Sequence, residues 1–268
     1  VIIRADGSMT YMLCSTIDDI DYNITHVIRG EDHVSNTAIQ IQMFEALGAQ
    51  NPTFGHLSLV KAKEDKISKR EGGYDVESMR YEKCLEAMAI NSFLALIGTS
   101  HHVIIHKNLA DLVKQFDIHS YSKSPTTFMP EELDQLNHKL VITLGFDEIQ
   151  NFLAEHHLSQ IDKNFWLAVR PNLQKLSDLR EWWQICHTPE QVKGLDHELL
   201  QISAKLLPAE ITNSTWQEWT AQISKASGKK GKELFLPLRL ALTGKTSGPE
   251  LKDLLPLLSR DEILARLK

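Results

Sequence analysis

Cysteine is scarce in this sequence. Its 268 residues include only three cysteines, Cys14, Cys84 and Cys186, which lie far apart and form no CxxC pair. This usage excludes a disulfide framework, argues against a structural zinc site and is typical of a reducing compartment. No apolar run approaches the roughly 20 residues that a membrane helix needs, and the first residues do not resemble a signal peptide. We therefore expect a cytoplasmic protein with no membrane partner.

Positive charge is also in short supply. Lys and Arg total 29 against 35 Asp and Glu, a formal net charge of −6, so the chain as a whole does not look like a nucleic-acid binder. The exception is residues 225–250, where six basic residues accompany two acidic ones, a local charge of +4. Composition alone favours a solvated face over an RNA-binding surface there. The twelve histidines include two adjacent pairs, but none has a partner at metal-ligand spacing, so we expect solvated or capping roles.

Apolar sequence is sufficient for a sizeable core. Hydrophobic residues make up 42% of the chain and charged residues 24%, and the length predicts two or three domains. Residues 81–98 carry a helical apolar face that ends at Gly98, and the chain from His138 onward predicts helix throughout. The tryptophans of this second half recur on helical faces, which favours a place in the core over base stacking.

The chain is organised around residues 25–47. Residues 25–28 are β-branched and apolar, which predicts a buried strand of a parallel sheet. Charge begins abruptly at Arg29, and residues 38–47 then predict a helix that Gly48 closes. The carboxyl end of such a strand is where open α/β sheets hold their ligands. Arg29 lies there as a planar donor suited to a carboxylate or a phosphate.

Two other regions predict strands. Residues 1–3 and 10–13 are expected to form a hairpin around a turn at residues 6–7. Residues 52–60, bounded by Pro52, are expected to form a further single strand.

Three motifs in this chain resemble those of bacterial glutamyl-tRNA synthetases. Residues 26–48 are similar to the family's HVIRGEDHxxNTxxQ segment, and residues 66–70, KISKR, to the KMSKR signature of class I synthetases. Residues 236–251 resemble the C-terminal pattern PLRxALTGxxxGPEL. Each motif is moderately specific, but the three occur in the family's order and spacing, and the resemblance covers nearly the whole chain.

The resemblance implies an α/β, partial Rossmann-type catalytic fold followed by mainly α-helical stem-contact and anticodon-binding domains. We expect half of the catalytic domain at residues 1–63, the KMSKR-type loop with the stem-contact fold at 64–137, and an all-helical anticodon-binding domain at 138–268. Full-length family members also carry an N-terminal half with a HIGH-type signature, which has no counterpart in this sequence. The chain is therefore expected to be a C-terminal portion that does not aminoacylate tRNA alone.

Catalysis and ATP binding are implied for the KISKR loop. Lys66 and Lys69 would stabilise the charge that grows on the leaving phosphates, and Ser68 would add a hydroxyl or cap the next turn. Adenylate formation needs little covalent participation by protein groups. Catalysis therefore depends mainly on positioning the substrates and stabilising charge. The alternative for the motif taken alone is a basic exposed loop.

Glutamate binding is implied for Tyr11, Arg29 and His33. Arg29 would grip the substrate's side-chain carboxylate through charge-assisted, bidentate hydrogen bonds, which prefer glutamate to glutamine. The alternative for Arg29 is an ion pair with Glu31 or Asp32. Tyr11 could instead pack as a strand aromatic with its hydroxyl at the rim, and His33 would shape the pocket without acting as a general base.

Contact with tRNA is implied for residues near both ends of the chain. Asp18 and Asp19 match an acidic pair that lies by the active site and the tRNA 3′ end in this family, and the alternative is a plain loop that ends a strand. Arg239, Gly248 and Pro249 match positions that contact anticodon bases in relatives.

The implied function is ATP-dependent ligation of L-glutamate to tRNA(Glu) through glutamyl-adenylate. ATP is a substrate, Mg²⁺ accompanies it, and the protein is expected to be a monomer. Two alternatives remain open: a non-catalytic tRNA-binding fragment, and a non-discriminating paralogue that charges tRNA(Gln) with glutamate. Glutaminyl-tRNA synthetase fits less well, because its anticodon region is built from β-barrels while the end of this chain predicts helix.

Overall fold

The computed structural model describes residues 2–62, 75–188 and 192–268. The chain divides into two compact units, one made of Val1–Glu82 and Ala87–Leu133 and the other of Lys83–Glu86 and Asp134–Lys268. The KISKR segment at residues 66–70 lies outside the described residues. None of the helices in the described part combines the length and apolarity needed to cross a bilayer.

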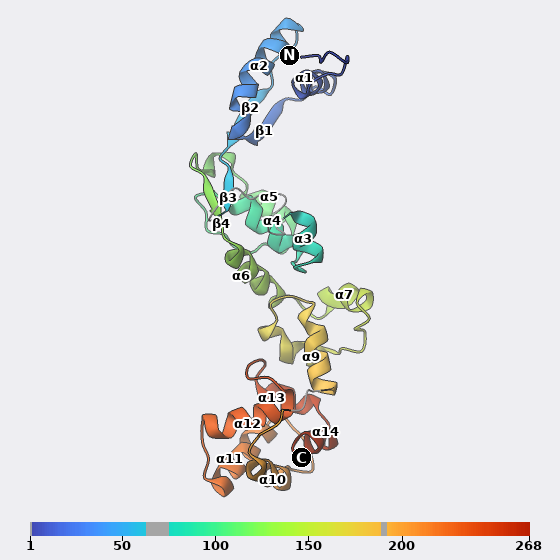
Figure 1. The fold of residues 1–268 in the computed structure, drawn as a ribbon, viewed down its shortest axis with the longest axis vertical. Helices are drawn as coiled ribbons and strands as arrows, with labels where there is room; N and C mark the ends of the chain where they lie inside the picture. Colours follow the sequence, from blue (N-terminus) through green and yellow to red (C-terminus); the bar gives the residue numbers. More distant parts are fainter. Residues whose placement is uncertain (1, 63–74, 189–191) are drawn as a thin grey trace. The chain divides into compact units, whose positions relative to one another are not determined.

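The first unit starts with a parallel strand–helix–strand arrangement (Figure 1). Strands β1 and β2 pair in parallel, and α2 connects them. The predicted parallel strand followed by a helix is therefore confirmed, and Gly48, with φ +70°, follows the end of that helix as expected. The elements of this part are α1 (Tyr11–Asp21), β1 (His26–Gly30), the 3-10 helix η1 (Glu31–His33), α2 (Val34–Ala46) and β2 (Thr53–Leu57).

The predicted N-terminal hairpin is wrong in its second strand. Ile3 and Met9 form an isolated antiparallel bridge, but helix α1 begins at Tyr11, where the return strand was expected. Residues Leu13, Thr16 and Ile20 share one helical face, and Thr16 is fully buried there. Packing of this face against α2 therefore stabilises a helix from Tyr11 onward, although the short sequence pattern there is typical of a strand.

Strand β1 is also less buried than its sequence predicts. Ile28 is 51% exposed, so the described residues leave part of its face of the two-stranded sheet uncovered. The single strand expected over residues 52–60 is two strands, since β2 ends at Leu57 and β3 (Val60–Ala62) belongs to a separate parallel pair with β4 (Thr126–Phe128).

The remaining elements of the first unit are helices. Helix α4 buries Ala89, Ile90, Phe93 and Leu96, and the Phe93 ring meets Phe128 edge-on at 5.3 Å. Helix α4 begins at Ala87 rather than near Tyr81, because Cys84 adopts a left-handed backbone with φ +55° that interrupts the predicted helix. The helix ends before Gly98, as predicted. The elements are α3 (Val76–Tyr81), α4 (Ala87–Leu96), α5 (Leu109–Gln115) and the 3-10 helix η2 (Ile118–Ser120).

The second unit contains helices and no strand among its described residues, as the sequence predicts. Trp166 and Trp219 are fully buried in its core, which confirms the prediction for these two tryptophans, and Trp219 Nε1 donates to Ser203 O at 2.9 Å. The elements are α6 (Pro130–Val141), whose first residues belong to the first unit, η3 (Asp147–Ile149), α7 (Gln150–Glu155), α8 (Lys163–Val169), η4 (Arg170–Asn172), α9 (Asp178–His187), α10 (His197–Leu206), α11 (Thr215–Ser227), α12 (Lys232–Thr243), α13 (Leu251–Leu254), η5 (Leu255–Leu257) and α14 (Arg260–Arg266).

A buried amide joins separate segments of the second unit. Asn137 is 1% exposed, accepts from the main-chain N–H of Glu86 at 2.7 Å and donates to Gln174 O at 2.7 Å. Its side chain uses both its carbonyl and its amino group, as a buried polar group must.

Candidate functional site

Arg29 lies near the carboxyl end of β1, where the sequence predicts the ligand site. Its Nη2 donates to Thr37 Oγ1 at 2.5 Å, and its guanidinium carbon lies 5.3 Å from the centre of the Phe54 ring. Its Nε is buried and has no acceptor. An unpartnered buried donor costs on the order of 1–3 kcal/mol, and an anion that reaches this guanidinium would offset that cost.

The alternative ion pair of Arg29 with Glu31 or Asp32 is absent from the described residues. Glu31 Oε1 instead accepts from the main-chain N–H of Leu59 at 3.4 Å, and Asp32 lies 3.9 Å from His33 Nε2.

Tyr11 and His33 lie together, as their common assignment to one site requires. Their ring centroids are 6.0 Å apart with an interplanar angle of 66°, and Tyr11 is 55% exposed. The exposure removes the alternative in which Tyr11 packs into the core. His33 Nδ1 lies 3.1 Å from Asn36 Nδ2, so an amide holds its ring.

Sequence reasoning missed Thr37 and His56, which both contact this site. Thr37 is 8% exposed, and its hydroxyl lies 2.8 Å from His56 Nε2 as well as next to Arg29. The parallel register places Arg29 and His56 opposite each other on β1 and β2. Thr37 lies within the segment HVIRGEDHxxNTxxQ and His56 within a predicted strand, but neither signal identifies the contact between the two residues.

Asp18 and Asp19 lie on helix α1, and one of them is electrostatically linked to Arg29. Burial raises the pKa of the Asp19 carboxyl above its usual value, and the charge of Arg29 opposes that rise. Asp18 is exposed. The acidic pair is therefore part of a helix near the Arg29 site. The alternative prediction, in which the pair forms a loop at the end of a strand, is wrong.

A second group of assigned residues lies together in the second unit. Arg239 on α12 donates through Nη2 to Pro249 O at 2.9 Å, while its Nη1 is buried with no acceptor. Burial lowers the pKa of the Arg239 guanidinium below its usual value, against the opposing charge of Glu250. Gly248 has φ +136° and lies against the Trp182 ring. The three residues assigned to the anticodon thus form one local cluster.

A hollow of about 280 Å³ adjoins Arg239. The rings of Trp216 and Phe235 lie 6.1 Å apart at an interplanar angle of 39°, and Phe235 is 44% exposed. Aromatic rings beside an unpartnered guanidinium donor suit a flat ring with acceptors on its edge, such as a nucleobase. The sequence predicts core aromatics here and misses Phe235. The lining residues are Trp216, Phe235, Arg239, Glu250, Leu251 and Lys252.

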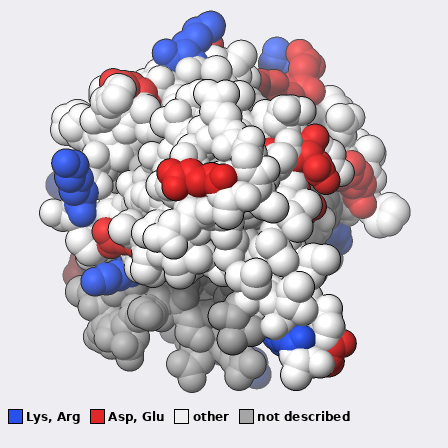
Figure 2. Space-filling model, turned by 90° about the horizontal axis from the view of Figure 1, so that it is seen from above, with Lys and Arg blue, Asp and Glu red and all other residues white. Residues whose placement is uncertain are grey.

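The basic stretch at residues 225–250 is partly neutralised in the structure. Lys229 pairs with Asp196, and Lys245 Nζ lies 2.8 Å from Glu181 Oε1. Because these two lysines are paired with carboxylates, we expect local groups such as Arg239 to provide the contacts with an anionic partner. Figure 2 draws another face, the one seen from above Figure 1, and there the acidic and basic side chains of the described residues are scattered.

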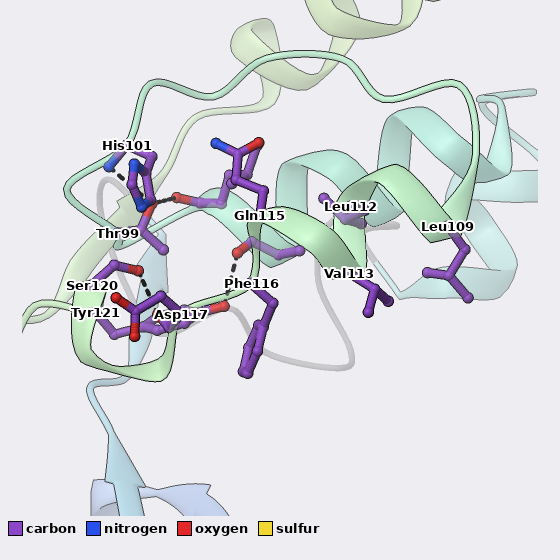
Figure 3. A pocket seen from close by; sticks show the side chains of 12 residues that line it. Thr99, His101, Leu109, Leu112, Val113, Gln115, Phe116, Asp117, Ser120 and Tyr121 are labelled. Carbon is purple, nitrogen blue, oxygen red and sulfur yellow. Dashed lines mark hydrogen bonds between the residues drawn. The ribbon is translucent and has the colours of Figure 1, made fainter.

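An apolar hollow of about 260 Å³ lies between α4 and α5 (Figure 3). The hydroxyls of Thr99, Ser120 and Tyr121 line it, but each donates to a main-chain oxygen, at 2.7, 2.7 and 2.8 Å. These hydroxyls have given their hydrogens to the main chain, and none of the residues assigned to the candidate site lines the hollow, so it is not part of that site. Likewise, the described residues contain no group of three or more His, Cys, Asp and Glu side chains placed to hold a metal.

Comparison with known proteins finds two family models that match different parts of the chain. Residues 1–135 match the family described as tRNA synthetases class I (E and Q), catalytic domain, and residues 147–268 match an anticodon binding domain. The fold class predicted from the sequence is confirmed by these matches.

Similar proteins are longer than this chain. A glutamate–tRNA ligase 1 of Rickettsia felis is 60% identical over 270 residues, which cover 100% of this chain and 60% of the relative. The ligase of the same name from Rickettsia bellii (strain OSU 85-389) is 59% identical, with 61% of its length covered. The chain thus spans about 60% of the length of these curated relatives.

Solved structures agree with the fold. The crystal structure of a glutamate-tRNA synthetase from Elizabethkingia anophelis matches with a TM-score of 0.78 at 23% identity, over 100% of this chain and 60% of that one. A glutamate tRNA ligase from Elizabethkingia meningosepticum, solved in complex with its amino acid, matches with a TM-score of 0.79 at 23% identity, over 100% of this chain and 61% of that one.

Proposed function

The chain belongs to the class I tRNA synthetases (E and Q), and from this premise we propose that the protein ligates L-glutamate to tRNA(Glu) at the expense of ATP. The observation that carries the proposal is Arg29 at the carboxyl end of β1, a guanidinium whose buried Nε has no acceptor and which the Thr37 hydroxyl links to the main-chain oxygen of His33. The ring of His33 in turn lies against that of Tyr11. The relatives at about 60% identity bear the name glutamate–tRNA ligase, which supports the same substrate.

The proposed reaction has two steps. The α-carboxylate of glutamate attacks the α-phosphate of ATP, so that glutamyl-adenylate forms and pyrophosphate leaves. A hydroxyl of the tRNA 3′-terminal ribose then attacks the activated carbonyl, which forms the ester and releases AMP. Mg²⁺ accompanies ATP and neutralises phosphate charge.

We assign ATP binding to Lys66, Ser68 and Lys69, and the catalytic stabilisation of the leaving phosphates to the two lysines. These residues lie outside the described residues, so the assignment depends on the KISKR motif. Lysine ammonium groups can stabilise charge on the leaving phosphates without taking part covalently.

In the amino-acid site we assign the side-chain carboxylate of glutamate to Arg29, with Tyr11 and His33 forming the neighbouring wall. The guanidinium presents planar donors that match a carboxylate, and its fixed charge disfavours the neutral amide of glutamine. Asp18 and Asp19 lie on the adjacent helix, and we assign them to the tRNA 3′ end.

For tRNA recognition we propose that Arg239, Gly248 and Pro249 contact the anticodon. The buried, acceptor-free Nη1 of Arg239 supports this role, as does the aromatic hollow beside it.

We further propose that the chain divides into half of the catalytic domain at residues 1–63, a KMSKR-type loop with the stem-contact fold at 64–137 and an anticodon-binding domain at 138–268. The protein is proposed to be a cytoplasmic monomer.

The test is a charging assay with the protein that carries this chain, ATP, radiolabelled amino acids and purified tRNAs. We expect glutamate, and not glutamine, to be attached to tRNA(Glu). Arg29→Ala should lower kcat/KM for glutamate by about 10- to 150-fold, since hydrogen bonds to charged groups contribute roughly 1.5–3 kcal/mol. Arg4→Ala is the matched control, because the side chain of Arg4, within the described ranges, bonds to Ser8 and Met9 of the N-terminal turn.

Attachment of glutamine in place of glutamate would contradict the proposal. A parallel assay with tRNA(Gln) separates the non-discriminating alternative, since glutamate on tRNA(Gln) at a comparable rate would replace the proposed tRNA specificity. Equal kcat/KM values for Arg29→Ala and Arg4→Ala would remove Arg29 from the amino-acid site.

A further inference from the structure

The hydroxyl of Thr37 makes three polar contacts at once. Its Oγ1 lies 2.5 Å from Arg29 Nη2, 2.8 Å from His56 Nε2 and 3.2 Å from His33 O. Thr37 is 8% exposed, so water has little access to compete for these bonds. The three contacts come from β1, β2 and η1, so this hydroxyl joins the elements around the proposed amino-acid site.

Counting hydrogens determines how the three contacts can be satisfied together. A threonine hydroxyl has one hydrogen and two acceptor lone pairs, and a guanidinium can only donate. Thr37 therefore accepts from Arg29, and because a carbonyl only accepts, it gives its single hydrogen to His33 O. The contact with His56 is then a hydrogen bond only if His56 carries a hydrogen on Nε2 and donates it to the second lone pair.

The Arg29 guanidinium is also held from another side. The Phe54 ring lies 5.3 Å from its central carbon, and Phe54 and His56 alternate with Gly55 along β2, so both project from the same face of that strand. The contact with Thr37 is the one hydrogen bond that the guanidinium makes among the described residues. Most of its five N–H donors are therefore free of protein acceptors.

We propose that Thr37 and His56 are positioning residues that orient the Arg29 guanidinium for the side-chain carboxylate of the amino-acid substrate. The inference rests on the proposed function. Long arginine side chains lose rotamer freedom when they bind, and an orientation set in advance reduces that loss. His56 acts through Thr37, because its Nε2 hydrogen occupies one lone pair and leaves the other for Arg29.

The kinetic test compares Thr37→Val with Thr37→Ser in the protein that carries this chain. Valine keeps the shape and loses the hydroxyl, so KM for glutamate should rise by about tenfold, the effect of losing one hydrogen bond to a charged group. Thr37→Ser restores the hydroxyl and should restore KM. KM for ATP should stay within about twofold in both variants, since a merely structural defect would affect both substrates.

Thr16→Val is the matched control. Thr16 is another buried threonine of the same unit, and among the described residues its hydroxyl bonds to Met12 O and the sulfur of Met43 and not to the Arg29 site. Its KM for glutamate should equal that of the unmodified protein. A Thr37→Val protein with unchanged KM, or a Thr37→Ser protein as impaired as Thr37→Val, would overturn the inference.

A spectroscopic measurement tests the arrangement without reference to activity. In nitrogen-15 NMR spectra of the 268-residue chain, His56 should show a protonated Nε2, and the Arg29 side-chain N–H signals should be sharp and should broaden in Thr37→Val. An unprotonated Nε2, or Arg29 signals that are the same in both proteins, would overturn the inference. If instead the unmodified protein charges no tRNA with glutamate, the proposed function fails while this measurement still decides whether Thr37 and His56 hold Arg29.

Discussion

At the residue scale, Gly248 shows how one position without a side chain shapes the cluster around Arg239. A Cβ atom at residue 248 would lie 2.0 Å from the Trp182 ring, and the backbone there has φ +136°. A side chain would therefore clash with the indole and strain the backbone at the same time. The adjacent Pro249 supplies the carbonyl that accepts from Arg239, so the close approach at Gly248 helps to place that carbonyl.

We expect Gly248→Ala to destabilise the chain by roughly 2–4 kcal/mol, the sum of overpacking and backbone strain. Gly228→Ala is the control, because Gly228 also has a positive φ, +75°, but a Cβ there would meet nothing within 4 Å. That variant should lose only about 1 kcal/mol. The measurement is urea unfolding of both variants and the unmodified chain. Equal losses would mean that Trp182 moves aside and that the contact does not constrain the cluster.

At the element scale, helix α14 begins with a capping box that depends on pH. Ser259 Oγ accepts from the main-chain N–H of Glu262, and Glu262 Oε2 accepts from the main-chain N–H of Ser259 at 2.7 Å. Burial raises the pKa of Glu262, but the hydrogen bonds from Ser259 and the charges of Arg266 and His187 outweigh it, so the pKa lies below its usual value. A lowered pKa in the folded state means that the ionised carboxylate stabilises the fold.

Ser259→Ala should therefore cost about 1 kcal/mol at neutral pH, the usual effect of losing an N-cap side chain. The contribution of the carboxylate is fully present above the unfolded-state pKa, about 4.3, and is lost as the pH falls through the lower pKa of the folded state. The difference between Ser259→Ala and the unmodified chain should shrink over that range. Ser177→Ala is the control, since Ser177 precedes α9 without making a side-chain cap bond.

Urea unfolding at several pH values measures this effect. A difference between Ser259→Ala and the unmodified chain that stays constant from neutral pH to below the pKa of Glu262 would exclude a contribution from the carboxylate.

At the scale of the whole molecule, charge sets the kind of RNA binding that is possible. The chain carries a net charge of −6, and two lysines of its basic stretch are paired with carboxylates. Non-specific attraction to nucleic acid should therefore be weak, and affinity for tRNA should come from a few local contacts.

We expect the 268-residue chain to bind tRNA with an affinity that falls between about 50 and 200 mM salt, but less steeply than the 10³- to 10⁵-fold typical of 6–10 phosphate contacts. Arg239→Ala should weaken binding by about tenfold or more. Lys205→Ala, which removes an exposed positive charge from α10, should change it by less than about twofold. Filter binding measures all three proteins, with urea unfolding as a check on folding. An affinity that salt does not alter, or equal effects of the two substitutions, would contradict this expectation.

Prediction of the fold from the sequence succeeded where a pattern is local and long. Runs of apolar residues, and the glycines and charged residues that end them, predict the order of elements from β1 through α2. They also predict the helical second half and the end of α4 near Gly98. The boundaries failed where a tertiary contact or a single backbone angle intervened. Helix α1 forms because it packs on α2, and α4 starts late because Cys84 adopts a left-handed backbone.

The sequence by itself determined the family, the fold class and the charged residues of the candidate sites. Arg29 and Arg239 could be identified because each of them lies in a motif of contiguous residues. Only the tertiary structure decided which neighbours hold those guanidinium groups. Thr37 contacts Arg29 from α2 and His56 contacts Thr37 from β2, while Trp182 of α9 lies against Gly248 in the bend after α12. Such contacts depend on the pairing of strands and the packing of helices, and no spacing along the chain encodes them.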